Sequence, residues 1–343
     1  MARHLWLFRP LAFSVALAAA SPSLPVSAQS GADFFRGKTM EFIIGSEPGG
    51  GYDTYGRAIA SHIVKHIPGN PTIVPKNMPG AGSLRALQYM NTVAAKDGTS
   101  ISILNPSMIN LSVVDPDKVG VDLNTMIWLG NVSSDNKVCV TWAKSPVSTL
   151  DDLKTKTFRL GGTSTSAGSH PPAAILKYIF PNTVHHVLGY SANSQIWVAL
   201  ERGEVEGNCT GWGIYPTQKP DWVREKLIRP LVKFTNKEIA GIEGVPSIYG
   251  LPIQDNLKSA IAFLMKADDI TRPVMAPPGI PAEHAAILRE AFAKMLKDPE
   301  FLDFAKKTRL EIDATSHQEL AAIIKDITST KPDDVALAKK LIE

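Results

Sequence analysis

Short apolar runs alternate with longer amphipathic stretches over most of the chain. Residues 40–45, MEFIIG, are apolar apart from Glu41, which is typical of a strand. Within residues 52–67, Ile59, Ile63 and Ile67 recur at intervals of four, which places them on one face of a helix. The first elements expected are therefore a strand, a loop and a helix.

The same order of elements repeats as far as residue 234, which predicts an α/β fold with mostly parallel strands. Further strands are expected at 72–78, 99–104, 127–132, 137–142, 158–160, 184–188 and 228–234, and further helices at 83–95, 173–179 and 194–202. The C-terminal part is instead helical, at 281–296 and 318–327. Ser316 and Glu319 have the spacing of a capping box, which predicts where the second of these helices begins.

The first 28 residues have the layout of a signal peptide. Arg3 and Arg9 give a basic start, LAFSVALAAA is an apolar core, and Val26-Ser27-Ala28 is a small-residue cleavage site. We expect cleavage near Ala28 and a periplasmic mature protein. The alternative is a membrane anchor, although the apolar run is shorter than the roughly 20 residues that a spanning helix needs.

Charge argues against a nucleic-acid partner. The chain has 36 basic and 33 acidic residues, and without residues 1–28 it keeps 34 basic residues, a net charge of +1. No basic footprint for nucleic acid or for a membrane surface is present. The mature length of about 315 residues suggests two domains, and we expect a monomer whose partner is a small molecule or a protein.

Cys139 and Cys209 are the two cysteines of the chain. In an exported protein they can form a disulfide, but two buried free thiols are an equally open alternative. The CxxC spacing of zinc and redox sites is absent.

The stretch FIIGSEPGGGYDTYGRAI, from Phe42, places three glycines between a strand and a helix. This layout presents backbone N–H groups to an anion. Gly51 is not followed by the Lys-Ser/Thr pair of a nucleotide P-loop, and the GxGxxG dinucleotide pattern is also missing. The remaining anion is a carboxylate, and the alternative is a tight turn without a ligand.

Metal, cofactor and hydrolase chemistry find little support. His62 and His66 share a helix face but have no third ligand, and His185 and His186 point to opposite faces of a strand. The segment GGTSTSAGSH lacks the GxSxG pattern of a nucleophile elbow. We therefore expect no metal, no cofactor and no enzyme activity.

Six short motifs, taken in order, resemble those of one protein family. They are PGGGYD at 48–53 followed by Arg57, NMPGAG at 77–82, KDGT at 96–99, LGGTS at 160–164, GEVE at 203–206 and APPGIP at 276–281. Together they cover almost the whole mature chain. The family is that of the periplasmic solute receptors of tripartite tricarboxylate transporters, often called Bug proteins.

The resemblance implies a two-domain, type II-like Venus-flytrap binding protein that delivers an organic carboxylate to integral-membrane transporter subunits. Domain 1 would comprise residues 29–133 and 246–343, and domain 2 residues 134–245, with crossings near 132–136 and 244–247. The ligand would lie in the cleft between them. An exported enzyme that uses Ser164, Ser169 or His170, or a ligand-reporting partner of a membrane sensor, are the alternatives.

Loops from both domains would then face the ligand, with backbone N–H groups and neutral side chains as donors and without need of an arginine. The expected ligand-binding residues are Gly49, Gly50, Gly51, Tyr52, Asp53, Pro79, Gly80, Ala81, Gly82, Asn105, Ser107, Thr163, Ser164, Thr165, Ser169, Tyr190, Ser191, Asn193 and Trp212.

The chain departs from many relatives beyond Gly203. Where they have an Asp and then a Phe-Asp pair, it has Glu206 and then Cys209-Thr210, followed by Trp212. Tyr190 and Trp212 could form an aromatic wall of the pocket or could pack in the core, so the ligand itself does not follow from the sequence.

Overall fold

The computed structural model describes residues 1–2, 31–163, 165, 167–191 and 193–343. Apart from its first two residues, the predicted leader therefore lies outside the described residues, and so does Ser164. Among the described residues, no helix combines the length and apolar character needed to cross a membrane.

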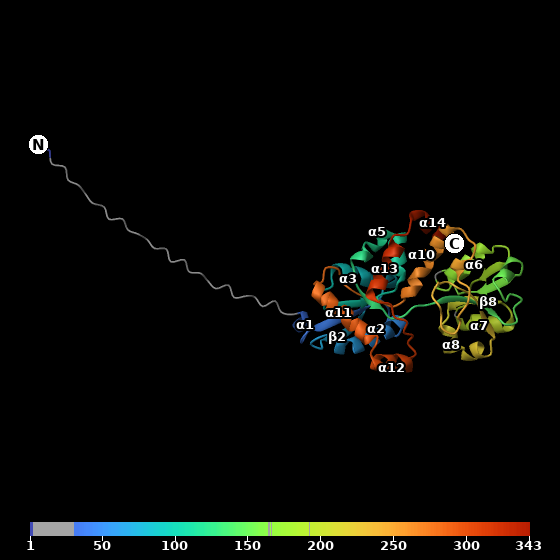
Figure 1. Ribbon diagram of the computed structural model, residues 1–343, viewed down its shortest axis with the longest axis horizontal. Helices are drawn as coiled ribbons and strands as arrows, with labels where there is room; N and C mark the ends of the chain where they lie inside the picture. Colours follow the sequence, from blue (N-terminus) through green and yellow to red (C-terminus); the bar gives the residue numbers. More distant parts are fainter. Residues whose placement is uncertain (3–30, 164, 166, 192) are drawn as a thin grey trace.

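Two five-stranded sheets, which we call sheet A and sheet B, organise the chain (Figure 1). In spatial order, sheet A contains β2 (Thr72–Asn77), β1 (Thr39–Ile44), β3 (Ser100–Ile103), β10 (Pro273–Ala276) and β4 (Ile127–Asn131). Sheet B contains β7 (Val184–Val187), β6 (Phe158–Gly161), β8 (Gly207–Gly211), β5 (Lys137–Trp142) and β9 (Ile228–Lys233).

Helices surround both sheets. Those before residue 130 are α1 (Gly31–Phe34), α2 (Gly51–Ile63), α3 (Leu84–Thr92), α4 (Ser107–Val114) and α5 (Pro116–Val119). Among the strands of sheet B are α6 (His170–Ile179), α7 (Asn193–Arg202), α8 (Ile214–Gln218) and α9 (Pro220–Arg224). The C-terminal part contains α10 (Asp255–Met265), α11 (Ala282–Met295), α12 (Pro299–Thr308), α13 (His317–Thr328) and α14 (Pro332–Ile342). Short 3₁₀ helices are η1 (Val64–His66), η2 (Ala81–Ser83), η3 (Leu123–Thr125), η4 (Asp151–Lys154), η5 (Ile248–Gly250) and η6 (Lys266–Ile270).

The burial of β1 explains why its sequence is an apolar run. Phe42 and Ile44 pack with Ile59 of α2, while Ile43 packs in a second cluster with Leu87 of α3. Successive side chains of a strand point to opposite faces, so the part of β1 that is buried on both faces, Phe42 to Ile44, is apolar at consecutive positions. The predicted α/β class is confirmed here, and so is the capping box of Ser316 and Glu319 at the start of α13.

The prediction of mostly parallel strands is confirmed, although both sheets are mixed: four strands of each sheet run in one direction and the fifth, β10 or β5, is reversed. β1, β2 and β3 are parallel to one another, but β10 pairs antiparallel with β3 and β4. In sheet B, β6 is parallel to β7 and β8, whereas β5 is antiparallel to β8 and β9. The cause is the chain path: β5 and β10 are the first strands after the chain changes sheet, and each enters its new sheet in the reverse direction.

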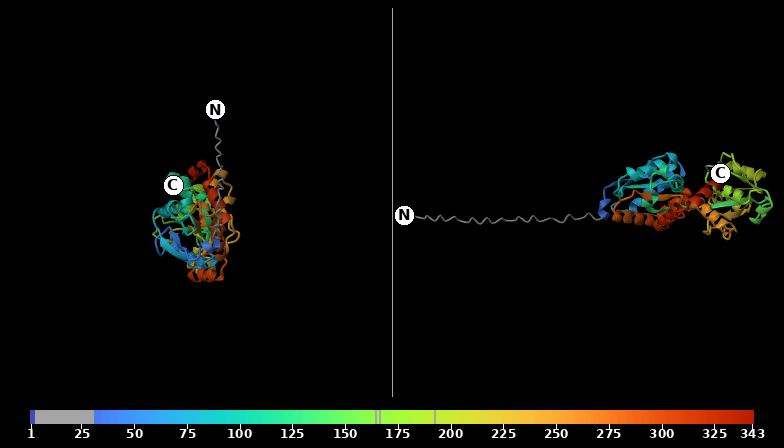
Figure 2. Two further views of the ribbon diagram at one scale, coloured as in Figure 1. Left: turned by 90° about the vertical axis from the view of Figure 1, so that its left-hand side faces the viewer. Right: turned by 90° about the horizontal axis from the view of Figure 1, so that it is seen from above.

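The chain passes from sheet A to sheet B between Asn131 and Lys137, and back between Lys233 and Pro273. The C-terminal helices then divide: α11 and α13 pack on β4, while α14 packs on both α10 and α6. The C-terminus lies beside α6 in Figure 1, and Figure 2 shows the two lobes side by side. The described chain thus forms two α/β lobes, one around each sheet, and the domain boundaries given above stay a prediction.

Candidate functional site

The glycine loop after β1 is held in place from within. The carboxylate of Asp53 is buried and accepts hydrogen bonds from the backbone N–H of Gly49 at 2.9 Å and from Nδ2 of Asn77 at 2.8 Å. Nε of Arg57 lies 3.0 Å from both carboxylate oxygens. Burial alone would raise the pKa of Asp53, but these hydrogen bonds lower it to about 2. Asp53 therefore fixes the loop as an anion and already uses the N–H of Gly49.

The loop after β2 contains four consecutive residues with positive φ. Gly80, Ala81, Gly82 and Ser83 have φ values of 141°, 45°, 64° and 84°. Such angles are uncommon for residues other than glycine, so Ala81 and Ser83 are strained.

Ser83, which the sequence analysis did not single out, explains how the strain in this loop is held. Its buried Oγ donates to the carbonyl of Gly45 at 2.8 Å and accepts from the N–H of Asn105 at 3.1 Å. Asn105 in turn accepts from the N–H of Ser107 through Oδ1, at 2.9 Å. Ser83 thus ties together the loops that follow β1, β2 and β3.

On sheet B, the predicted residues belong to two adjoining loops that lead into α6 and α7. The N–H of Gly189 donates to the carbonyl of Thr163 at 3.0 Å, which joins the loops, and the N–H of Ser191 donates to Oε1 of Gln195 at 2.9 Å. Thr165 is exposed, and Ser169 and Asn193 are half-buried where α6 and α7 begin.

The two aromatic candidates take part in the packing of sheet B. Trp212 is only 6% exposed and its ring lies 5.7 Å from that of Tyr215 in the core. Tyr190 is half-buried and packs against the same cluster.

Four charged residues that the sequence analysis missed lie where the chain crosses between the sheets. We call Asp135, Lys137, Asp268 and Arg272 the hinge cluster. The backbone ties its two segments together, because the N–H of Asp135 donates to the carbonyl of Asp268 at 2.7 Å. Lys137 is the first residue of β5, and Arg272 directly precedes β10. Because β5 and β10 run antiparallel to their neighbours, both cations lie at the edge where the parallel strands end.

Arg272 lies beside the glycine loop of sheet A. Its guanidinium carbon is 4.4 Å from the ring centre of Tyr52 and 4.9 Å from that of Tyr55. A Cβ on Gly51, the first residue of α2, would lie 3.3 Å from Nη2 of Arg272. Among the described residues, no carboxylate lies within 4.0 Å of this guanidinium. Its Nη1 donates to the carbonyl of Thr271 at 2.8 Å, and its buried Nε has no hydrogen-bond partner. An unpaired guanidinium at a helix N-terminus is suited to bind a carboxylate.

Lys137 lies beside the loop of sheet B. A Cβ on Gly168 would lie 3.5 Å from its Nζ. The ammonium is buried, pairs closely with Asp135 and lies 4.0 Å from Asp268. Burial alone would lower the pKa of Lys137, but the charges of Asp268 and Asp135 raise it. In contrast to Arg272, Lys137 is already neutralised by the protein.

Cys139 and Cys209 form a disulfide. They stand directly opposite each other in the register of β5 and β8 and are almost fully buried. The bridge closes a loop of 70 residues that contains β6, α6, β7 and α7, which carry the sheet B part of the candidate site.

The histidines have structural partners or lie apart. His66 pairs with Asp298 at 2.7 Å, and His62 bonds the carbonyl of Ala58 at 2.7 Å. His170 is 5% exposed and its Nε2 bonds the carbonyl of Ile342 at 2.8 Å. Burial, first, and the nearby charges of His170 and Lys177 lower the pKa of His186 to about 4. Within the described ranges, no group of three or more His, Cys, Asp or Glu side chains is arranged to hold a metal ion.

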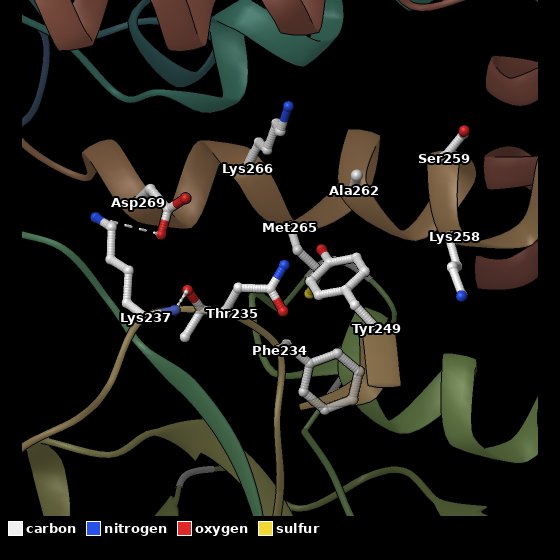
Figure 3. A pocket seen from close by; sticks show the side chains of 11 residues that line it. Phe234, Thr235, Lys237, Tyr249, Lys258, Ser259, Ala262, Met265, Lys266 and Asp269 are labelled. Atoms are coloured by element: carbon white, nitrogen blue, oxygen red, sulfur yellow. Dashed lines mark hydrogen bonds and ion pairs between the residues drawn. The ribbon is translucent and has the colours of Figure 1, made fainter. Parts of the chain in front are cut away.

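A separate cavity of about 470 Å³ borders the second crossing. Figure 3 shows its walls, the segment from Phe234 to Lys237 with Tyr249 on one side and α10 with η6 on the other. Lys237 is bound to Asp269 at 3.7 Å, and the amines of Lys258 and Lys266 point in different directions. Its cations do not converge on one point, so this cavity is a weaker candidate for an anion than the surroundings of Arg272.

Comparison with solved structures confirms the predicted two-domain periplasmic-binding-protein fold. A TctC solute-binding protein from Polaromonas, without ligand, matches with a TM-score of 0.68 and 20% identity over 89% of this chain and 98% of that one. MatC from Rhodopseudomonas palustris with bound malate matches at a TM-score of 0.54, 16% identity, 89% of this chain and 99% of that one. Rpa4515 of R. palustris with adipate matches at 0.56 and 18%, over 89% of this chain and 97% of that one. No family model matches the sequence, and no curated protein matches it.

Proposed function

We propose that the chain is an extracytoplasmic solute receptor that captures a small organic carboxylate between its two domains. The observation that carries the proposal is Arg272, an unpaired guanidinium stacked on Tyr52 at the N-terminus of α2. The loops after β1, β2 and β3 adjoin it, and the hinge cluster continues from it to Gly168 of sheet B. The fold shared with MatC and Rpa4515, which hold malate and adipate, supports the same reading.

The ligand-binding residues remain those predicted from the sequence, with Arg272 added as the carboxylate anchor. Gly50, Gly51 and Gly80 permit close approach of the ligand, and Thr163 to Ser169 close over it from the other domain. Trp212 is buried, so it would contribute to the far end of the site by packing beneath the residues that contact the ligand. The domain boundaries are part of the proposal, as 29–133 with 246–343 and 134–245.

A receptor role is preferred to an enzyme because His170, the base that a hydrolase would need, already bonds the C-terminal helix. The proposed partners are integral-membrane transporter subunits, which would recognise the ligand-closed form. A partner of a membrane sensor would use the same site. The proposed location is the periplasm, with the leader removed near Ala28. Intact mass of the exported protein tests this, because the chain should begin at Gln29.

A thermal-shift screen of the mature protein tests the function. The panel should contain C4 to C6 carboxylic acids with one or two acid groups, including malate and adipate, and the amide of each acid as a control. A ligand at about 100 times its Kd should add about 2.7 kcal/mol to the free energy of unfolding. Stabilisation by at least one acid and not by its amide is expected. A panel without any stabilising acid would contradict the proposal.

A further inference from the structure

The hinge cluster extends from Arg272, beside Gly51 of α2, to Lys137 and Asp135, beside Gly168 and Gly211 of the sheet B lobe. Among the described residues, Lys137 is the only cation within 4.0 Å of the carboxylates of Asp135 and Asp268. Glu311 and Asp313 approach from the segment between α12 and α13, where Asp313 bonds Oγ of Ser134. Burial and the charges of Asp135 and Asp313 raise the pKa of Glu311. Of these four carboxyl groups, those of Asp135 and Asp268 pair with the ammonium of Lys137.

These acids adjoin the candidate ligand site from both sheets. A Cβ on Gly211, at the end of β8, would collide with the carboxylate of Asp135, and a Cβ on Gly213 would lie 2.5 Å from Oε2 of Glu311. Both glycines stand where β8 leads into α8, at the edge from which Thr163 and Tyr190 also arise. A ligand with one carboxylate on Arg272 therefore extends toward carboxyl groups of the protein.

We propose that Asp135 and Asp268 determine specificity and that the receptor selects monocarboxylates whose far end carries a hydrogen-bond donor. An ammonium or hydroxyl group at that end can donate to the acids, whereas a second carboxylate meets like charge without a free cation. This inference rests on the proposed function. It separates the chain from MatC and Rpa4515, whose ligands, malate and adipate, have two acid groups.

Selection of this kind uses repulsion as well as attraction. The carboxylates of the protein lower the affinity for a dicarboxylate by repulsion. They do not repel a monocarboxylate with a donor at its far end, so the affinities for these two kinds of ligand differ. Lys137 does not offset the effect, because its charge is already shared between two acids at the same edge. Arg272 is taken by the first carboxylate, beside Tyr52 and Gly51 of α2, whereas Asp135 lies beside Gly211 at the end of β8.

Matched ligands test the proposal on the unmodified mature protein. For each chain length from C4 to C6, calorimetry compares the ω-amino acid, the ω-hydroxy acid and the dicarboxylic acid at pH 7.5. The donor-bearing acids should bind at least about tenfold more tightly than the dicarboxylate of equal length. Tighter binding of the dicarboxylate would overturn the inference while leaving the receptor function intact. If none of the acids binds, the proposed function fails as well.

Burial, followed by the charges of Asp135 and Asp269, raises the pKa of Asp268 to about 7, although Lys137 opposes this shift. At pH 7.5 the carboxyl is therefore mostly ionised, and Asp268→Asn provides the decisive variant because it removes this charge and leaves the pair of Lys137 and Asp135 in place. It should raise the affinity for the dicarboxylate relative to the ω-amino acid by about tenfold. Asp269→Asn is the matched control, because Asp269 is next to Asp268 in the sequence but pairs with Lys237 at the separate cavity of Figure 3. A ratio that moves equally in both variants, or in neither, would overturn the role of Asp268. Thermal melting verifies that each variant is folded, and the comparison on the unmodified protein stands without them.

Discussion

The guanidinium carbon of Arg272 lies 4.4 Å from the ring centre of Tyr52, so this cation rests on an aromatic face and not in an ion pair. Tyr52 belongs to α2 and Arg272 directly precedes β10, so the two residues are far apart in the sequence. Burial raises the pKa of Tyr52 to about 12, so its phenol stays neutral and does not compete for the charge of Arg272. The guanidinium is therefore available to a bound anion.

Replacing Arg272 by glutamine should weaken binding of the carboxylate ligand by roughly 10–100-fold, because a charge-assisted hydrogen bond contributes about 1.5–3 kcal/mol. Calorimetry on the folded variant measures the change. Arg224→Gln is the control, since Arg224 is exposed on α9 and pairs with Asp221. Equal affinities for Arg272→Gln and the control would remove Arg272 from the site.

A valine at Gly50 distinguishes a ligand site from a simple turn. Gly50 has φ −84° and ψ 174°, which any residue can adopt, and a Cβ there would meet only the carbonyl of Glu47, at 3.8 Å. Gly50→Val should therefore leave stability almost unchanged and reduce ligand affinity by about tenfold or more through collision with the ligand.

Gly80→Val provides the contrast, because φ at Gly80 is 141° and a side chain there is strained. This variant should lose both stability and affinity. If Gly50→Val binds ligand as tightly as the unmodified protein, the loop serves only as a turn.

Stability should fall in acid as Asp53 becomes protonated. The pKa of Asp53 is lowered to about 2 in the folded protein, from an ordinary value near 4, so the folded state favours the ionised form. This contribution is complete above about pH 4 and is lost as the pH falls toward 2. It amounts to about 2 kcal/mol, an upper estimate.

Urea unfolding of the unmodified protein and of Asp53→Asn at pH 7 and pH 3 measures this contribution. The difference in the free energy of unfolding between the two proteins should shrink at pH 3. A difference that is the same at both pH values would show that the ionised carboxylate does not hold the loop.

The disulfide of Cys139 and Cys209 should stabilise the protein mainly by restricting the unfolded chain. For a loop of 70 residues the expected contribution is about 2–4 kcal/mol. The double variant Cys139→Ser/Cys209→Ser should lose this amount of the free energy of unfolding in urea. A reduced sample of the unmodified protein should show the same loss. Labelling of both cysteines in unfolded, unreduced protein would contradict the bridge.

Local sequence patterns were sufficient to predict most of the strands of this fold and its longer amphipathic helices α2, α11 and α13. The apolar run at 40–45 is β1, and the stripe of Ile59, Ile63 and Ile67 is α2 and the turn after it. β8 was missed, because Gly207–Gly211 has low strand propensity and is held by its neighbours and by Cys139 across the sheet. β10 was missed for a similar reason, since its four residues begin with a proline.

The candidate site was predictable only in part. Glycine runs mark the loops after β1 and β2 because backbone freedom is a local property. Arg272 and Lys137 lie far from those loops in the sequence, and nothing local marks them. Their place follows from the reversed entry of β10 and β5 into the sheets, which depends on the topology of the whole chain.

Calorimetric titration of the mature protein with its best-binding acid and with the methyl ester of that acid tests the central claim most directly. The ester keeps the size and shape of the ligand but removes the charge and the acceptor geometry that Arg272 and the loop N–H groups require. We expect saturable binding of one molecule of acid per chain and a loss of about 100-fold or more with the ester. Equal binding of the acid and its ester would contradict carboxylate recognition at this site.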